Sequence, residues 1–204
     1  MCIYQFRRTF HLYFRGDKML DYLFSVRVYH NTIDGLLLES IQEEIAKLIS
    51  INESNLNFTW GDQILTTFKN NTNVVENSPI FKKFIMEEID IYLKEFQINK
   101  KNPEIYESWI ALSKKDGYQN FHTHLYDANI SGVYYYKTNT EDGDIVFKTD
   151  SGGINHSILN LEVFKNYKPE IGKIILFPSF LEHKVSRNLT DNDRISIAFN
   201  CKLT

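Results

Sequence analysis

The sequence has few cysteines, no long apolar run and no strong excess of charge of either sign. Only Cys2 and Cys201 occur among the 204 residues, without metal-type spacing, which excludes a disulfide framework and fits a reducing, cytoplasmic compartment. No stretch approaches the roughly 20 apolar residues that a membrane span needs, so we expect no membrane partner. The 23 basic and 26 acidic side chains give a net charge of −3, which shows no footprint of nucleic-acid binding.

The amino-acid composition is that of a globular domain. Apolar residues make up 43% and charged residues 24%, which excludes disordered, collagen-like and coiled-coil classes. Aromatic residues reach 14%, which favours a sheet-rich fold. We expect one domain over residues 19–204 and treat residues 1–18 as an uncertain N-terminal extension, because Met19 is an alternative start and the segment lacks the apolar core of a secretory signal. No sequence motif defines an oligomeric state, and a homodimer is the one oligomer that we consider.

The first half of the chain predicts a short strand at residues 23–30 and two helices. Residues 32–50 repeat apolar side chains with a helical period, and residues 51–77 read as loop with at most one short strand. Ser78 followed by Pro79 is typical of a helix start, a capping hydroxyl and then proline at the first helical position, and this helix should continue to about residue 97.

The second half predicts a succession of short strands separated by turn signals. Such spacing is typical of an antiparallel sandwich or barrel. The fold class we expect is therefore α+β and mainly β: a double-stranded β-helix (jelly-roll or cupin-like) core at about residues 105–204 with two packed N-terminal helices. The predicted strands are residues 105–112, 118–125, 129–137, 143–149, 157–164, 172–178, 183–188 and 194–201.

Three of the six histidines are candidates for metal binding. Residues i and i+2 of a strand point to the same face, so His122 and His124 would present two imidazoles side by side. Alone, this His-x-His pattern is a weak signal. His183 strengthens it, because this histidine follows a buried strand that ends in a proline turn.

Arg194 and Ser196 open another buried strand. Burying an arginine in a core strand costs free energy unless its charge meets an anion. The planar guanidinium group suits a carboxylate, and the Ser196 hydroxyl would donate one further hydrogen bond to it. A metal site together with a buried carboxylate clamp fits a non-haem iron centre that binds a keto acid.

These motifs, in this order, resemble the iron(II)/2-oxoglutarate-dependent oxygenases, and more narrowly the uncharacterised 2OG-Fe(II) oxygenase branch of bacteria and their phages. The resemblance covers about residues 105–200, and Arg-x-Ser close to the distal histidine is its most specific part. It is carried by residues 109–112, 117–124, 131–135, 143–147, 172–178, 183–185 and 194–200.

The resemblance implies two cofactors, Fe(II) and the co-substrate 2-oxoglutarate, and a role for each matching position. His122 and His183 match the two histidine ligands of the iron, and Arg194 with Ser196 matches the pair that holds the C5 carboxylate of 2-oxoglutarate. Tyr135 matches a strand tyrosine that faces the co-substrate. By strand alternation Ser131 and Val133 share its face.

One position departs from the family pattern. The family at large has Asp or Glu where this sequence has His124. Three interpretations follow: three histidine ligands, a site in which His124 is the proximal ligand and Asp127 the carboxylate, or a site that has lost iron. We favour the three catalytic histidines, because position 127 would have to bend back from a turn.

The activity that the resemblance implies is hydroxylation of an unidentified substrate, with release of succinate and CO2. The alternative is a cupin-type metal protein that does not use 2-oxoglutarate, and the Arg194–Ser196 pair argues against it. A structural jelly roll, a third class, has no need of converging histidines.

Overall fold

The computed structural model describes residues 26–59, 63–70, 73–98, 102–125, 128–148 and 163–204. The N-terminal extension, Asp127 and most of the strand predicted at 157–164 lie outside these ranges. None of the helices in the described ranges is long and apolar enough to cross a membrane.

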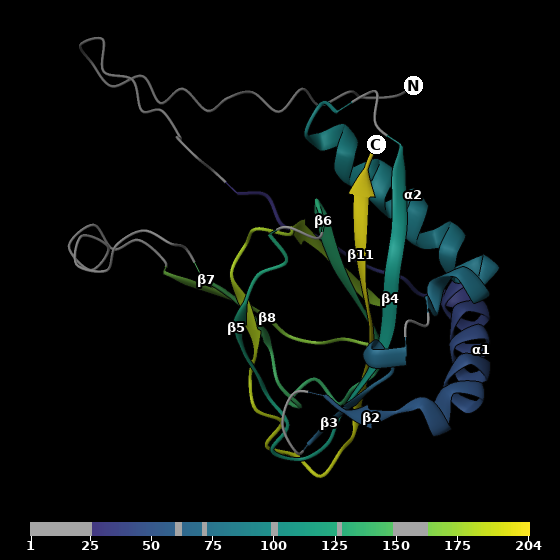
Figure 1. Ribbon diagram of the computed structural model, residues 1–204, viewed down its shortest axis with the longest axis vertical. Helices are drawn as coiled ribbons and strands as arrows, with labels where there is room; N and C mark the ends of the chain where they lie inside the picture. The colour runs from purple at the N-terminus through teal and green to yellow at the C-terminus, as the bar shows by residue number, and fades with distance from the viewer. Residues whose placement is uncertain (1–25, 60–62, 71–72, 99–101, 126–127, 149–162) are drawn as a thin grey trace.

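Two antiparallel sheets and two helices make up the fold (Figure 1). The larger sheet has the strand order β1-β9-β6-β11-β4-β3-β2, and the smaller has the order β5-β10-β7-β8. This is the predicted double-stranded β-helix with two N-terminal helices. The elements are β1 (Tyr29–Thr32), α1 (Gly35–Asn52), β2 (Asn57–Phe58), β3 (Ile64–Thr66), α2 (Pro79–Glu95), β4 (Pro103–Ser113), β5 (Gln119–His122), β6 (Ile130–Lys137), β7 (Ile145–Lys148), β8 (Phe164–Tyr167), β9 (Lys173–Pro178), β10 (His183–Val185) and β11 (Arg194–Leu203), with 3-10 turns at Glu53–Asn55, Phe68–Asn70 and Val75–Asn77.

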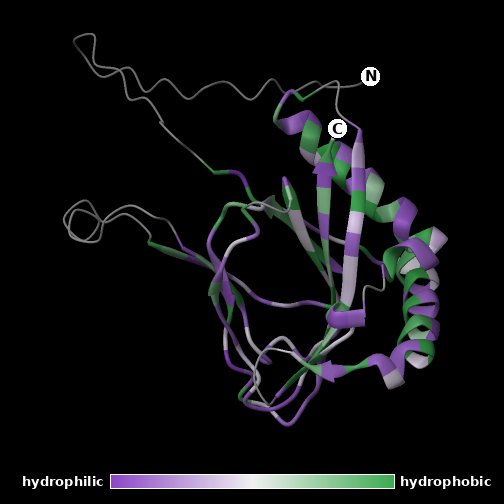
Figure 2. Ribbon diagram, viewed as in Figure 1, coloured by the Kyte–Doolittle hydropathy of each residue, from purple (hydrophilic) through white to green (hydrophobic). Residues whose placement is uncertain are grey.

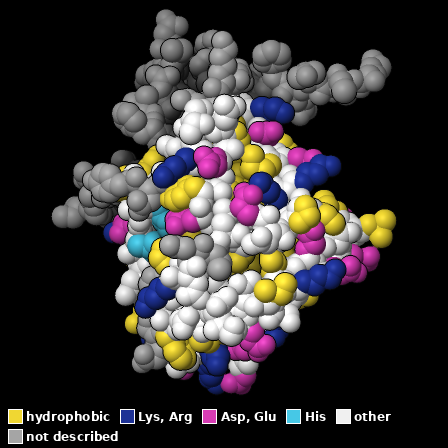
Figure 3. All heavy atoms as spheres, turned by 45° about the vertical axis from the view of Figure 1, so that its right-hand side comes forward, with side chains coloured by type: hydrophobic (Ala, Val, Ile, Leu, Met, Phe, Trp, Pro, Cys, Tyr) yellow, Lys and Arg dark blue, Asp and Glu magenta, His cyan; other side chains and the backbone are white. Residues whose placement is uncertain are grey.

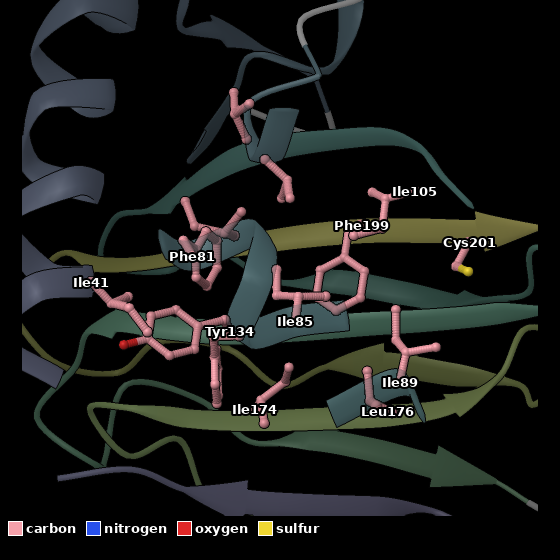
Figure 4. Close-up of a cluster of buried hydrophobic side chains, with 14 of the residues drawn as sticks. Ile41, Phe81, Ile85, Ile89, Ile105, Tyr134, Ile174, Leu176, Phe199 and Cys201 are labelled. Carbon is pink, nitrogen blue, oxygen red and sulfur yellow. The ribbon is translucent and has the colours of Figure 1, made fainter. Parts of the chain in front are cut away.

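Helices α1 and α2 cover one face of the larger sheet, and the smaller sheet lies against its other side (Figure 1). Both helices carry apolar and polar residues in alternation along their length (Figure 2). Their buried side chains recur every three or four residues, as in α2 at Phe81, Ile85 and Ile89, because one stripe of the helix must face the sheet. Figure 4 shows these side chains packed against Tyr134 and Phe199 of the sheet.

The start of α2 differs in detail from the prediction. The Ser78 hydroxyl makes no capping bond to the helix and donates instead to the carbonyl of Val74. The free amides of Ile80 and Phe81 donate to the Glu44 carboxylate of α1, at 3.2 and 2.9 Å. A carboxylate at a helix N-terminus satisfies these donors and complements the helix dipole, so α1 caps α2.

The predicted strand ends differ more than the predicted helices. Of the strand expected at residues 23–30, residues 23–25 lie outside the described ranges, residues 26–28 are not in a strand, and β1 begins at Tyr29. The described part of the segment 51–77 contains two short strands, β2 and β3, rather than one. The strand expected at 118–125 ends at His122.

Candidate functional site

The three histidines predicted as ligands come together where β5 and β10 meet. His122 at the end of β5 and His183 at the start of β10 are direct cross-strand partners. His124 follows two residues later, and one ring nitrogen of each histidine lies within 4.8 Å of those of the other two. His30 lies elsewhere, on β1. Residues far apart in the sequence therefore form one cluster of imidazoles.

His124 reaches the cluster for a different reason from the one predicted. It lies beyond the end of β5, so strand alternation does not place it. Its backbone N–H donates to the carbonyl of Ser179 at 2.9 Å, and its carbonyl accepts from the N–H of Ala128. Its ring lies nearly parallel to that of Trp109, with 6.4 Å between centroids. The backbone of His124 is thus hydrogen-bonded to the segment that follows β9, and this contact positions the ring.

Burial favours the neutral form of two of the imidazoles, those of His122 and His183. Desolvation, with a smaller contribution from His122, lowers the pKa of His183 to about 3. Desolvation also lowers the pKa of His122. Neutral imidazole is the form that binds metals.

The chemistry of the cluster fits a metal ion. Metal–nitrogen bonds of about 2.1 Å place neighbouring ligand atoms about 3 Å apart, so the ring nitrogens would move closer together around an ion. Imidazole ligands suit iron, zinc, copper and nickel. No carboxylate belongs to this cluster among the described residues.

The predicted co-substrate residues line a cavity of about 80 Å³ between the sheets, which we call the inner cavity. The three histidines border the same cavity. Its wall on the larger sheet consists of residues that are paired across β4, β11 and β6. These cross-strand rows are Asn200–Ser131, Trp109–Ala198–Val133 and Ala111–Ser196–Tyr135, and Glu107, the partner of Asn200 on β4, lines the outer hollow described below.

Arg194 is held at one end of its guanidinium group. The side chain is 5% exposed, and Nη1 donates to the carbonyls of Asp142 and Gly143 at 3.0 and 2.7 Å. Nε is buried without a hydrogen-bond partner, and burial lowers the pKa of the group. A buried cation with an unsatisfied donor beside a cavity is the arrangement expected of a carboxylate site.

Tyr135 and Ser131 lie on the same wall. Desolvation, opposed by the charge of Arg194, raises the pKa of Tyr135 to about 12, so its hydroxyl stays protonated and able to donate. The Ser131 hydroxyl lies 2.9 Å from that of Ser179 and donates to Oδ1 of Asn200 at 2.8 Å.

A second, larger hollow of about 710 Å³ adjoins the inner cavity, and we call it the outer hollow. Trp109, Gln119, His122 and His124 line both spaces. Its remaining walls combine four aromatic residues with polar and acidic ones, and it has room for a small molecule next to the histidines. The other residues lining it are Gln63, Phe68, Tyr106, Glu107, Asp116, Gly117, Tyr118, Asn120 and Phe121.

Sequence reasoning missed Asn200, which contacts the cluster, and Glu107, which contacts Asn200. Nδ2 of Asn200 lies 3.0 Å from Nδ1 of His124, and the same amide donates to the carboxylate of Glu107. Only the register of β4 against β11 brings these side chains together, and the sequence holds no local signal of that register. Asp127, the alternative carboxylate ligand, lies outside the described residues.

The comparisons with known proteins agree with this architecture. The fold and the cavity define the class of double-stranded β-helix proteins with a histidine cluster between two sheets. Within that class, residues 107–200 match the family described as "Putative 2OG-Fe(II) oxygenase". The match confirms the resemblance expected from the sequence. No curated protein matches the chain.

Solved structures with this fold are remote in sequence. The carbocyclase SnoK of nogalamycin biosynthesis is 8% identical, with a TM-score of 0.64 over 86% of this chain and 79% of SnoK. HygX from Streptomyces hygroscopicus, solved with nickel, 2-oxoglutarate and hygromycin B, is 14% identical, with a TM-score of 0.58 over 87% of this chain and 83% of HygX. A Pseudomonas putida prolyl-4-hydroxylase is 14% identical, with a TM-score of 0.58 over 87% of this chain and 93% of that one.

Proposed function

We propose that the protein is an Fe(II)- and 2-oxoglutarate-dependent dioxygenase that hydroxylates a small molecule. The observation that carries this proposal is the convergence of three imidazoles and one buried, incompletely paired guanidinium on a single cavity. His122, His124 and His183 would hold the metal, and together with 2-oxoglutarate the bound iron supplies the oxidation of a C–H bond by dioxygen, with succinate and CO2 as co-products.

The inner wall would bind and orient the co-substrate. Arg194 and Ser196 would hold the distal carboxylate, because the guanidinium has a free donor and the hydroxyl lies two residues along the same strand. Tyr135 would donate a hydrogen bond to the same ligand, while Ser131 and Val133 shape the wall on which it lies.

Aromatic residues of the core exclude water from one side of the metal site. The ring of Phe177 lies with its centroid 4.7 Å from that of His183, and Phe147 packs against both rings. The other side faces the outer hollow, through which the substrate would approach His122 and His124. The protein thus orients its reactants and shields them from solvent.

The surface charge is consistent with a small substrate rather than a nucleic acid. On the face shown in Figure 3, acidic and basic side chains are interspersed without a large area of one sign. The net charge of −3 also disfavours tight binding of a polyanion. HygX, which has the same fold, was solved with a small antibiotic bound.

Anaerobic titration with Fe(II) and 2-oxoglutarate tests the proposal without knowledge of the substrate. We expect a weak visible charge-transfer band that develops only when both are present. Metal binding without this band would favour the cupin alternative, and failure to bind any divalent metal would favour a site that has lost iron.

A further inference from the structure

The rings of His122 and His183 are set to present a free nitrogen to a metal. A neutral imidazole carries one proton, and the other nitrogen keeps a lone pair. Nδ1 of His122 lies 2.8 Å from the carbonyl oxygen of Asn120, and Nδ1 of His183 lies 2.8 Å from that of Leu181. A carbonyl can only accept, so both protons are on Nδ1 and both Nε2 atoms keep their lone pairs.

The ring of His124 is set the opposite way. Its Nδ1 lies 3.0 Å from Nδ2 of Asn200, an amide NH2 group that can only donate. Nδ1 of His124 therefore accepts, and the proton of the neutral ring is on Nε2. Neither nitrogen is then available to a metal, because one is covered by the amide and the other carries the proton.

Glu107 determines which end of the Asn200 amide faces His124. Nδ2 of Asn200 also donates to the Glu107 carboxylate, which can only accept. At the other end, Oδ1 accepts from Ser131, whose hydroxyl could equally donate to Ser179 and accept from an amide. Of the two neighbours of Asn200 in the Glu107–Asn200–Ser131 row, Glu107 is therefore the one that permits only one orientation of the Asn200 amide.

We propose that Glu107 and Asn200 are positioning residues that hold His124 in the tautomer that cannot coordinate. This inference rests on the proposed metal centre. His122 and His183 form its permanent ligand pair, and His124 joins them only when the Asn200 amide turns over and offers Oδ1 to an Nδ1–H group. The reversed amide faces Glu107 with an oxygen, so Glu107 weakens the metal site.

Glu107→Gln separates this role from a merely structural one. Glutamine can donate to the reversed Asn200 amide, so the variant should release His124 to the coordinating tautomer. Glu104→Gln removes an exposed carboxylate from the same strand and serves as the matched control.

The first readout is the tautomer of each histidine in the metal-free protein. Long-range ¹H–¹⁵N spectra at pH 8, where imidazoles are neutral, should show Nδ1–H for His122 and His183 and Nε2–H for His124. In Glu107→Gln, His124 should convert to Nδ1–H. An Nδ1–H form of His124 in the wild-type protein, or no change in the variant, would overturn the inference.

The second readout is nickel affinity by calorimetry. Glu107→Gln should bind Ni(II) about tenfold more tightly, in line with the effect of changes around metal ligands, while Glu104→Gln should match the wild type. Equal affinities of all three proteins would overturn the inference and leave the metal centre standing. Absence of binding in all three would overturn the proposed function instead.

Asn200→Ala provides a second test if Glu107→Gln does not fold. Loss of the amide donor should reduce the Nε2–H population of His124 in the same spectra. An unchanged tautomer would contradict the proposed role of Asn200.

Discussion

Single residues of the inner cavity combine firm anchoring with one free hydrogen-bonding atom. Arg194 is the clearest case, since Nη1 is fixed by two backbone carbonyls while Nε has no partner. The anchoring limits the rotamer entropy lost on binding, and the free donor gives a carboxylate a fixed point of attachment.

Arg194→Ala should raise the dissociation constant for 2-oxoglutarate about 10- to 100-fold. A hydrogen bond to a charged group contributes roughly 1.5–3 kcal/mol, and the alanine removes it. Calorimetry on the Ni(II)-loaded protein measures the effect, with nickel affinity itself unchanged. Lys83→Ala, which removes an exposed cation on α2, is the control. Wild-type affinity in Arg194→Ala would mean that another group holds the co-substrate.

His183→Ala should abolish metal binding, because it removes one of the two rings with a free Nε2. His30→Ala removes an exposed imidazole from β1 and should leave nickel affinity as in the wild type. Metal content after dialysis, measured by mass spectrometry, distinguishes the two. Retention of nickel by His183→Ala would exclude this cluster as the site.

The sequence identified the side chains of the site better than it explained their positions. Arg194 and the histidines stand out because charged and metal-binding side chains next to buried strands are unusual. His124 was expected on a strand, yet a turn docked on Ser179 positions it. The Glu107–Asn200 contact was not predicted at all, because cross-strand register is a property of the folded sheet.

At the level of elements, the loop between β6 and β7 supports the clamp. Asp142 is fully buried and accepts from Thr138 and Asn192, and its carbonyl binds Arg194. Gly143 follows with φ of +105°, and a Cβ atom there would lie 2.3 Å from the carbonyl oxygen of Ser186. The loop therefore needs glycine at this position.

Gly143→Ala should weaken 2-oxoglutarate binding as well as stability, because the added methyl group would also lie 3.1 Å from Nη1 of Arg194. Gly35→Ala, at φ of +60° with nothing within 4 Å, should cost about 1–2 kcal/mol of unfolding free energy and leave binding intact. Denaturant unfolding and calorimetry separate the two effects. Equal 2-oxoglutarate affinity in both variants would show that the loop does not support Arg194.

Helices were predicted more accurately than strand ends. The 3.6-residue period extends over four or five turns in α1 and α2, so a shift of one residue hardly changes the pattern. Strands such as β5 and β10 have three or four residues, and their limits depend on pairing with neighbours. The capping of α2 by Glu44 of α1 is likewise a tertiary contact without a local signal.

At the level of the whole molecule, the helices and the site occupy opposite faces of the larger sheet. The helix-side cluster contains Ile41, Phe81 and Phe199, while a smaller cluster with Phe147 and Phe177 lies beside the histidines between the sheets. The inner cavity is therefore enclosed by both sheets, and a ligand there would contact both.

Ni(II) with 2-oxoglutarate should raise the midpoint of thermal unfolding. A ligand present at 100 times its dissociation constant adds about 2.7 kcal/mol, which corresponds to roughly 5–10 °C for a domain of this size. Glutarate, which lacks the 2-oxo group, should give a smaller shift, and EDTA should remove the effect of nickel. An unchanged midpoint with both ligands would exclude binding at the enclosed site.

The row of Glu107, Asn200 and Ser131 spans three strands whose residues are widely separated in the chain. Each member supplies the donor or acceptor that the next one lacks, so a substitution at one position changes what the other two can accept. Among homologues these three positions should therefore vary jointly, and proteins with a carboxylate at position 124 should be free to lack the acid at position 107.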